Sequence, residues 1–257
     1  MRTWARTARA DTPTLVRPAM PRQSASLRFG RDGGDERPGP APVAPHTHLI
    51  RLLPTPTGTP FTFVYGLILV ATTVLTRVAD PAAVSRWLAG SSAHVENLAQ
   101  EPLFVLVASA LFYAGPLLSP FAVGFILVLT ALERRIGGWR TAAVFAVGHL
   151  LATLATQLTV AAAVALGHLP ESSLTRFDYG ISYGVLACTG GLAGVLRAVW
   201  LRWLLLAAVG TMVISDLVSL TDPLTNWGHL IALLTGIALW PLLRRYQRRG
   251  SAAPRSA

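Results

Sequence analysis

Hydrophobic positions form long, nearly unbroken runs from about residue 60 onward, whereas the first sixty residues are rich in Arg, Pro and Gly. A helix needs about 20 predominantly apolar residues to cross the hydrocarbon core of a bilayer. Six runs approach or exceed that length and predict six transmembrane helices. They cover residues 61–78, 115–132, 139–166, 180–199, 201–220 and 226–243. The pattern therefore predicts an all-α membrane protein with a six-helix bundle.

The distribution of arginine orients these spans. A seventh apolar run, residues 102–113, has the length of an interfacial or re-entrant element. If it does not span and the N-terminus is cytoplasmic, 19 of the 22 basic residues, all of them arginine, lie inside, as the positive-inside rule requires. The three arginines left outside are Arg77, Arg86 and Arg176. Counting the seventh run as a span would move the three arginines between the second and third spans outside. We therefore predict six spans with both termini cytoplasmic.

The two ends of the chain differ from the apolar part. Residues 1–57 are rich in Arg, Pro and Gly and show no sustained apolar period, so they cannot bury enough surface to fold alone. We predict a disordered cytoplasmic tail over 1–57, a membrane domain over 58–246 and a disordered basic tail over 247–257. No apolar segment with a small-residue cleavage site occurs in the first thirty residues, which argues against a cleaved signal peptide.

Composition excludes several classes of protein. Hydrophobic residues make up 52% and charged residues 13% of the chain, against about a quarter charged in soluble domains, which argues against an ordinary soluble enzyme. The net charge of +10 comes from arginines in the connections between apolar runs, so it indicates membrane topology and no nucleic-acid partner. The single cysteine, Cys188, excludes an intramolecular disulfide and a cysteine-based metal cluster. The sequence calls for no cofactor.

Two polar side chains are predicted to share a depth near the outer face. Ser182 lies at the start of the fourth span and His229 near the start of the sixth, and both spans descend from outside. Small residues recur at every fourth position of the sixth span, which allows helix backbones to approach closely. A hydroxyl and an imidazole in contact form the minimal unit of nucleophilic catalysis. The alternative is that Ser182 is a packing residue or helix N-cap and His229 an interfacial histidine.

The order of these features resembles the rhomboid intramembrane serine proteases over residues 61–243. A short apolar element follows the first span, Glu133-Arg134-Arg135-Ile136-Gly137 closes the second, and Gly-x-Ser opens the fourth. In the sixth span His229 is followed by Ala232 and Gly236. The resemblance implies that Ser182 is the nucleophile and His229 the base of a dyad without a catalytic Asp. It also implies a multi-pass protein of a bacterial plasma membrane.

The sequence departs from the rhomboid pattern at three places. Tyr183 follows the serine where rhomboids usually have Gly, residues 117–121 lack their His-x-x-x-Asn, and Arg86-Trp87 reverses their Trp-Arg signature. Two hypotheses therefore stay open, a protease that cleaves single-span proteins near their outer end, and an inactive protein that binds transmembrane segments of its partners. A transporter is less favoured, because the sequence shows no evident inverted repeat and no acidic residue at mid-membrane depth.

Other polar residues are assigned structural roles. His149 falls near mid-membrane in the third span, where we expect a hydrogen bond to a neighbouring helix rather than a proton relay. Asp178 and Asp222 precede the fourth and sixth spans and are expected to cap them, because a carboxylate accepts from the free amides of a helix N-terminus. Asp216, late in the fifth span, fits a capping role less well, and neither orientation of His229 nor a bond to a neighbouring helix is expected of it.

Overall fold

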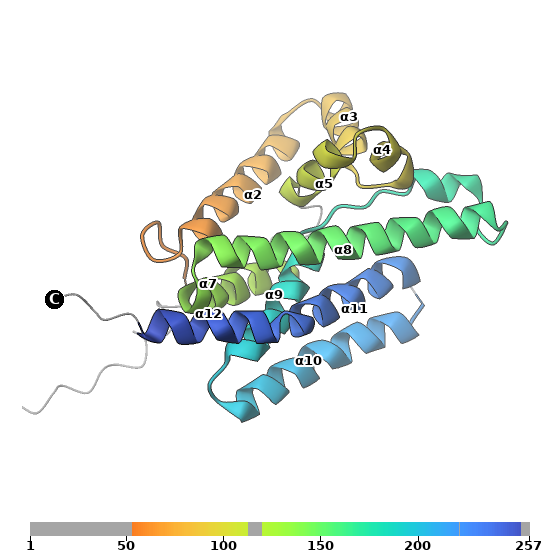
Figure 1. Cartoon of the computed structure of the whole chain (residues 1–257). Coiled ribbons are helices and arrows are strands. Elements are labelled where there is room, and N and C mark those ends of the chain that lie inside the picture. The colour runs from red at the N-terminus through yellow and green to blue at the C-terminus, as the bar shows by residue number, and fades with distance from the viewer. Residues whose placement is uncertain (1–52, 113–119, 221, 253–257) are drawn as a thin grey trace, which may run out of the picture. The chain divides into compact units, whose positions relative to one another are not determined.

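The computed structural model of this chain describes residues 53–112, 120–220 and 222–252. Within these residues all regular structure is helical (Figure 1). Most of the predicted N-terminal tail, the last five residues and the predicted beginning of the second span lie outside the described residues. So does most of the 117–121 segment in which the rhomboid His-x-x-x-Asn would fall.

The first half of the chain supplies one long helix, a connection of short helices and a composite helix. The long helix is α2 (Pro60–Val78), and α3 (Pro81–Ser91), α4 (Val95–Gln100) and α5 (Pro102–Leu111) make the connection. The composite helix runs without a break through α6 (Pro120–Gly124), the π-helix η1 (Phe125–Leu129) and α7 (Thr130–Ile136). Proline stands at the first turn of α2, α3 and α5, where its missing N–H costs no hydrogen bond. The apolar run at 102–113 is thus a short helix, as its length predicted.

The second half holds the longer helices. They are α8 (Gly138–Ala165), a 3₁₀ turn η2 (Glu171–Thr175), α9 (Ile181–Val195), α10 (Val199–Val218), α11 (Pro223–Ala238) and α12 (Trp240–Ala252). Gly137 joins α7 to α8 with φ +88° and ψ 159°, a backbone conformation that essentially only glycine adopts. This requirement explains the glycine that ends the Glu-Arg-Arg-Ile-Gly segment.

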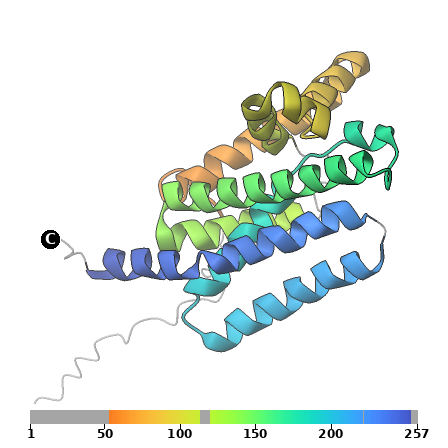
Figure 2. The same cartoon turned by 45° about the vertical axis from the view of Figure 1, so that its right-hand side comes forward.

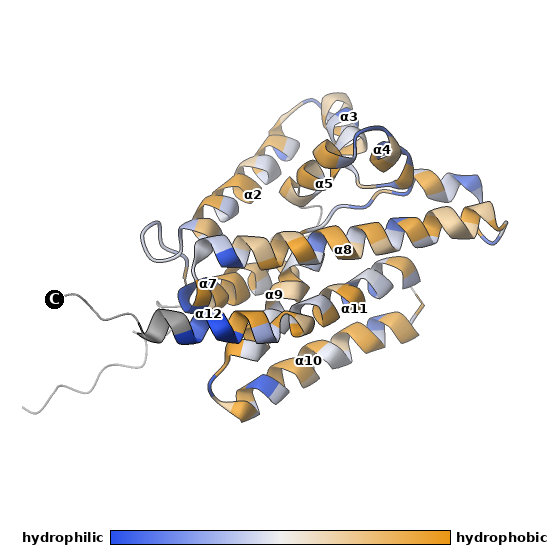
Figure 3. Cartoon of the chain, in the orientation of Figure 1, coloured by the Kyte–Doolittle hydropathy of each residue, from blue (hydrophilic) through white to orange (hydrophobic). Residues whose placement is uncertain are grey.

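Helix length and exposure identify a membrane protein. Three helices, α2, α8 and α10, are long and apolar enough to cross a bilayer, and α11 with α12 would make a fourth span bent by 41°. Val213 is the single fully buried residue of α10, and most of the large apolar side chains of this helix are exposed. Figure 3 shows hydrophobic residues along most of the helices and hydrophilic ones gathered on α12 and at the start of α10. These features support an all-α integral membrane protein.

Helix α9 is the core of the bundle. Every residue from Ile181 to Val195 is buried except Ser182. In both views this helix runs between α8 and α11 (Figure 1, Figure 2). A Cβ on Gly190 would clash with the Leu233 carbonyl of α11, and a Cβ on Gly236 would clash with the Ala187 carbonyl of α9. The predicted close approach of these helices at their small residues is therefore confirmed.

Several boundaries differ from those that the apolar runs predict. Helix α9 ends at Val195 rather than 199, because the backbone turns at Leu196 into the connection to α10. The sixth apolar run is two helices, with the bend next to Leu239. Helix α12 continues through Ala252, so helix occupies the first part of the segment for which we predicted a disordered tail from residue 247.

Candidate active site

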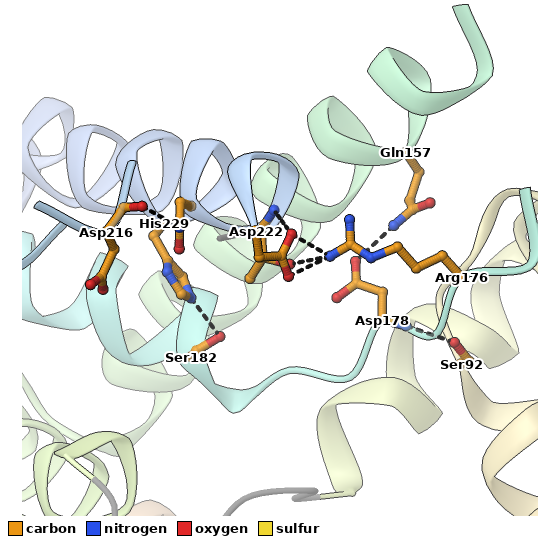
Figure 4. A network of polar contacts seen from close by, with 10 residues as sticks. Ser92, Gln157, Arg176, Asp178, Ser182, Asp216, Asp222 and His229 are labelled. Carbon is orange, nitrogen blue, oxygen red and sulfur yellow. Dashed lines mark hydrogen bonds and ion pairs between the residues drawn. The ribbon is translucent and has the colours of Figure 1, made fainter. Parts of the chain in front are cut away.

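Ser182 and His229 meet near the N-terminal ends of α9 and α11. The Nε2 atom of His229 lies 3.1 Å from Ser182 Oγ, which is hydrogen-bond distance (Figure 4). Ser182 is the second residue of α9 and is half-buried, whereas His229 is 6% exposed on α11. The hydroxyl is therefore reachable from outside the bundle while the imidazole is enclosed.

Two aromatic rings hold the imidazole. The Phe121 ring, from α6, lies 5.2 Å from the His229 ring, and the Tyr183 ring lies 5.5 Å away at a steep angle of 69°. The opposite nitrogen of the imidazole, Nδ1, is buried and has no hydrogen-bond partner among the described residues. Packing against aromatic rings therefore orients this imidazole. In a Ser-His-Asp triad, by contrast, a hydrogen bond to a carboxylate orients it.

Tyr183 does not crowd the serine. Its side chain is 1% exposed and packs between α8 and α11, where a Cβ on Gly228 would come within 2.7 Å of the Tyr183 ring. Successive residues of a helix point about 100° apart, so a bulky ring at 183 can enter the core while Ser182 faces the entrance. The bulky residue that stands where rhomboids usually have Gly thus directs its ring into the core.

An ion pair joins the segments that lead into α9 and α11. Arg176 Nη2 donates to both carboxylate oxygens of Asp222 at 2.6 Å and to Thr225 Oγ1 at 2.7 Å. Asp222 also accepts from the Thr225 amide, so the predicted N-cap of α11 is confirmed. Figure 4 shows this pair beside the Ser182–His229 contact. The pair therefore ties together the entries of the two helices that carry the candidate dyad.

Asp178 has a different role from the predicted helix cap. The N-cap of α9 is Gly180 and no side chain caps this helix. The Asp178 carboxylate instead accepts from Gln157 Nε2 of α8 at 2.8 Å, and its backbone N–H donates to Ser92 Oγ at 2.8 Å. Burial raises the pKa of Asp178 to about 6, although the Gln157 hydrogen bond and the charge of Arg176 favour the ionised form. This residue anchors the segment before Ser182 to α8 and to the outer connection.

His149 and Asp216 do not join the candidate dyad. His149 Nε2 lies 3.0 Å from the Leu106 carbonyl and 3.3 Å from Ser109 Oγ, both on α5. The expected bond to a neighbouring helix is therefore confirmed. No hydrogen bond joins the Asp216 carboxylate to His229, whose Nδ1 is unpaired in the described part of the chain. Asp216 instead accepts through its backbone carbonyl from Asn226 Nδ2 at 2.7 Å.

Sequence reasoning missed the role of Glu133. Its side chain is 3% exposed, and its carboxylate accepts from the amides of Phe61 and Thr62 and from Thr62 Oγ1 at 2.6–2.9 Å. It therefore satisfies free N–H groups at the start of α2. The one signal in the sequence was an acidic residue at the end of an apolar run. Its partner lies 71 residues away, so spacing could not reveal it.

The site has the groups for acyl transfer by a serine. An accessible hydroxyl contacts an imidazole nitrogen, and the uncapped first turn of α9 leaves backbone N–H groups beside it. Within the described residues, no three His, Cys, Asp or Glu side chains form a group that could hold a metal ion.

Comparisons with known proteins are consistent with this arrangement. No curated protein and no solved structure matches the chain. A family model described as rhomboid-like protein matches residues 57–249, which include every helix described above except the last residues of α12. With a match over most of its length, an all-helical membrane fold and serine and histidine meeting at two helix ends, this chain belongs to the rhomboid-like protein family.

Proposed function

We propose that this protein is an intramembrane serine protease that uses Ser182 and His229. The observation that carries the proposal is the 3.1 Å contact between Oγ and Nε2, made by the one residue of α9 that is not buried. If Ser182 only packed in the core or capped a helix, it would need neither a contact with His229 nor an exposed surface. A serine and a histidine within hydrogen-bond reach meet the geometric requirement for a nucleophile and its base.

The proposed reaction follows from the two side chains. Ser182 Oγ attacks the carbonyl carbon of the scissile peptide bond while His229 Nε2 takes the hydroxyl proton. The imidazolium then gives that proton to the leaving nitrogen, which breaks the peptide bond and leaves an acyl-enzyme. A water molecule, deprotonated by the same imidazole, attacks the ester carbonyl; the acyl C–O bond then breaks, the imidazolium returns its proton to Ser182 Oγ, and the second product leaves as a carboxylic acid. The imidazole accepts a proton in each attack and gives it up when the bond breaks, so His229 is neutral again at the end of the cycle.

The first turn of α9 is the proposed source of oxyanion stabilisation. A helix N-terminus has free backbone N–H groups, and no side chain accepts from those of α9. We propose that the free N–H groups around Ser182 stabilise the negative charge that develops on the carbonyl oxygen. One such donor contributes about 10² to 10³ in rate. These donors would partly offset the absence of a rhomboid-type His-x-x-x-Asn between residues 117 and 121.

We propose six spans for the membrane domain, residues 58–246, with both tails cytoplasmic. The spans are α2, α6 to α7, α8, α9, α10, and α11 with α12. This assignment places 19 of 22 arginines inside and the Ser182–His229 contact near the outer face of the plasma membrane. The substrates would then be single-span membrane proteins, cleaved near their outer ends.

The second candidate is an inactive rhomboid-like protein that binds transmembrane segments. Its support is that His229 Nδ1 has no orienting partner among the described residues and that Tyr183 replaces the usual glycine. Such a protein would retain its partners whether or not Ser182 is present.

A fluorophosphonate probe separates the two candidates, because it captures an activated serine without knowledge of the substrate. We expect labelling of the full chain in lipid nanodiscs, and a loss of labelling rate of about 10³-fold or more in Ser182→Ala and in His229→Ala. Ser85→Ala, at an exposed serine of α3, is the matched control and should label as wild type does. Absence of labelling in folded wild type would favour the binding protein, as would equal labelling of Ser182→Ala and wild type.

A further inference from the structure

A pocket lined by arginine lies at the opposite end of α9 from Ser182. It has a volume of about 720 Å³ and is formed where α7 ends, α9 turns into α10 and α12 passes by. Its lining residues are Arg134, Arg135, Leu196, Arg197, Ala198, Leu201 and Gln247. Helix α9 has 15 residues, so about 22 Å separate this pocket from the start of the helix. The pocket is therefore distinct from the candidate active site.

No acidic side chain neutralises these arginines within the part of the chain that the structure describes. No carboxylate lines the pocket, and the one ion pair among the described residues, Arg176–Asp222, is at the outer end. Glu133 is adjacent in sequence, but its carboxylate is buried against α2 and already accepts three hydrogen bonds. Three guanidinium groups around one pocket repel each other unless an anion lies between them.

The guanidinium groups keep donors to spare. Arg134 donates to the Leu53 carbonyl at 3.2 Å and Arg135 to the Ala131 carbonyl at 2.6 Å, whereas each guanidinium has five N–H donors. Other arginines at this end are committed to protein groups. Arg202 and Arg244 donate to carbonyls at the end of α9, and each lies over the Trp240 ring. Arg134 and Arg135 therefore keep N–H donors that a ligand in the pocket can use.

The apolar wall of the pocket indicates the kind of anion. Leu196, Ala198 and Leu201 line one side, and Leu201 continues into the outward-facing apolar surface of α10. Trp200 and Trp203 are exposed on the same turns, as is typical of residues at the level of lipid headgroups. Arginine binds phosphate oxygens with paired N–H donors, and basic pockets between spans on the cytoplasmic side suit anionic headgroups.

We propose that this pocket binds the phosphate group of an anionic phospholipid, whose acyl chains lie along α10. The phosphodiester oxygens accept from Arg134, Arg135 and Arg197, and the first methylene groups contact Leu196 and Leu201. A free phosphate ion would satisfy the arginines equally well but would leave the apolar wall uncovered. The proposal does not depend on whether Ser182 is catalytic.

Native mass spectrometry of the detergent-solubilised full chain tests the proposal, with phosphatidylglycerol, phosphatidylcholine and inorganic phosphate as separate probes. We expect phosphatidylglycerol to bind wild type more tightly than phosphatidylcholine does. Arg135→Gln/Arg197→Gln should weaken phosphatidylglycerol binding about tenfold or more, since the variant removes two of the three charged donors proposed to hold the phosphate. Arg77→Gln/Arg86→Gln removes the same charge from arginines of α2 and α3 and should bind as wild type does.

Three outcomes would overturn the proposal. Equal losses in the two double variants would mean general electrostatic attraction, and equal binding of both lipids by wild type would mean no headgroup selection. Binding of inorganic phosphate as tight as that of the lipid would make the ligand a free anion. Arg197→Gln alone, in the exposed turn before α10, tests the same pocket without altering a helix. Fluorophosphonate labelling of Ser182 should be unchanged in every variant, so this result and the test of the protease remain separate.

Discussion

Single side chains near the N-terminal ends of α9 and α11 combine burial with polarity. Ser182 is the one accessible residue of a buried helix, and His229 is enclosed by the rings of Phe121 and Tyr183. Asp178 is partly buried; its carboxylate accepts from Gln157 of α8, and its backbone N–H donates to Ser92 Oγ in the turn after α3. Each of these groups depends on its neighbours to offset the cost of leaving water.

Replacement of Asp178 should make stability less dependent on pH. Its pKa is raised by burial from an ordinary 3.8 to about 6, so the protonated form favours the folded state. That stabilisation is complete below about pH 4 and is lost as the pH rises through 6. At pH 7.5 the ionised carboxylate costs about 3 kcal/mol relative to a neutral group. Asp178→Asn, which can still accept from Gln157, should therefore unfold at a higher temperature than wild type at pH 7.5 and at a similar temperature at pH 4.

Thermal unfolding in detergent, followed by tryptophan fluorescence across this pH range, measures the difference. Asp80→Asn is the matched control, because Asp80 caps α3 from an exposed position and asparagine can also cap a helix. The prediction would be contradicted if wild type were more stable than Asp178→Asn at pH 7.5. The interactions of the ionised carboxylate with its partners would then outweigh the cost of burying its charge.

Two elements, α9 and α11, are held together at both their outer ends and their middles. The Arg176–Asp222 pair joins the segments that lead into them, and glycines allow their backbones to touch further down. The ion pair is about two-fifths exposed, so it contributes no more than about 1 kcal/mol. Backbone contact at the glycines therefore sets the distance between the helices that carry Ser182 and His229.

One added methyl group should test this contact. A Cβ at Gly236 would meet the Ala187 backbone of α9, which cannot move aside as a side chain can. Gly236→Ala should lower the free energy of unfolding by about 1 to 3 kcal/mol and reduce fluorophosphonate labelling of Ser182. Gly210→Ala in α10, where nothing lies within 4 Å, should gain up to about 1 kcal/mol from helix propensity. Equal stability of the two variants would rule out a tight α9–α11 contact.

At the scale of the whole molecule, arginine is divided between the two ends of the bundle. Among the described residues, α7, the start of α8, the α9–α10 turn, the start of α10 and α12 carry most of the arginines, and Arg77, Arg86 and Arg176 lie at the other end. This division is the basis of the proposed orientation in the membrane, and some of the same arginines form the pocket proposed to bind lipid phosphate.

Cysteine accessibility tests the proposed orientation. The one native cysteine, Cys188, is completely buried in α9, so it should give little background. A membrane-impermeant maleimide added to intact cells should label Ser85→Cys, in α3, but label Ser256→Cys only after the membrane is permeabilised. Labelling of Ser256→Cys in intact cells would place the C-terminus outside and contradict an even number of spans with a cytoplasmic N-terminus.

The sequence by itself determined the class of protein and the residues worth testing. The effects of apolar runs, arginine placement and recurring glycines depend on residues close together in the sequence. They therefore predict membrane helices and close helix packing without knowledge of the tertiary structure. The order of Glu133, Ser182 and His229 carried the family resemblance, which the family match from 57 to 249 confirms. The run lengths did not reveal that the sixth run bends or that two more helices precede α5.

Only the tertiary structure decided how distant residues meet. In the structure Tyr183 is buried in the core, whereas Ser182 is only half-buried. Glu133 contacts the start of α2, and Asp178 binds a partner on α8 and does not cap α9. It also gathered arginines from α7 and from the α9–α10 turn around one pocket. These relations depend on which helix faces pack together. Sequence spacing carries no information about that choice, because each contact joins residues tens of positions apart.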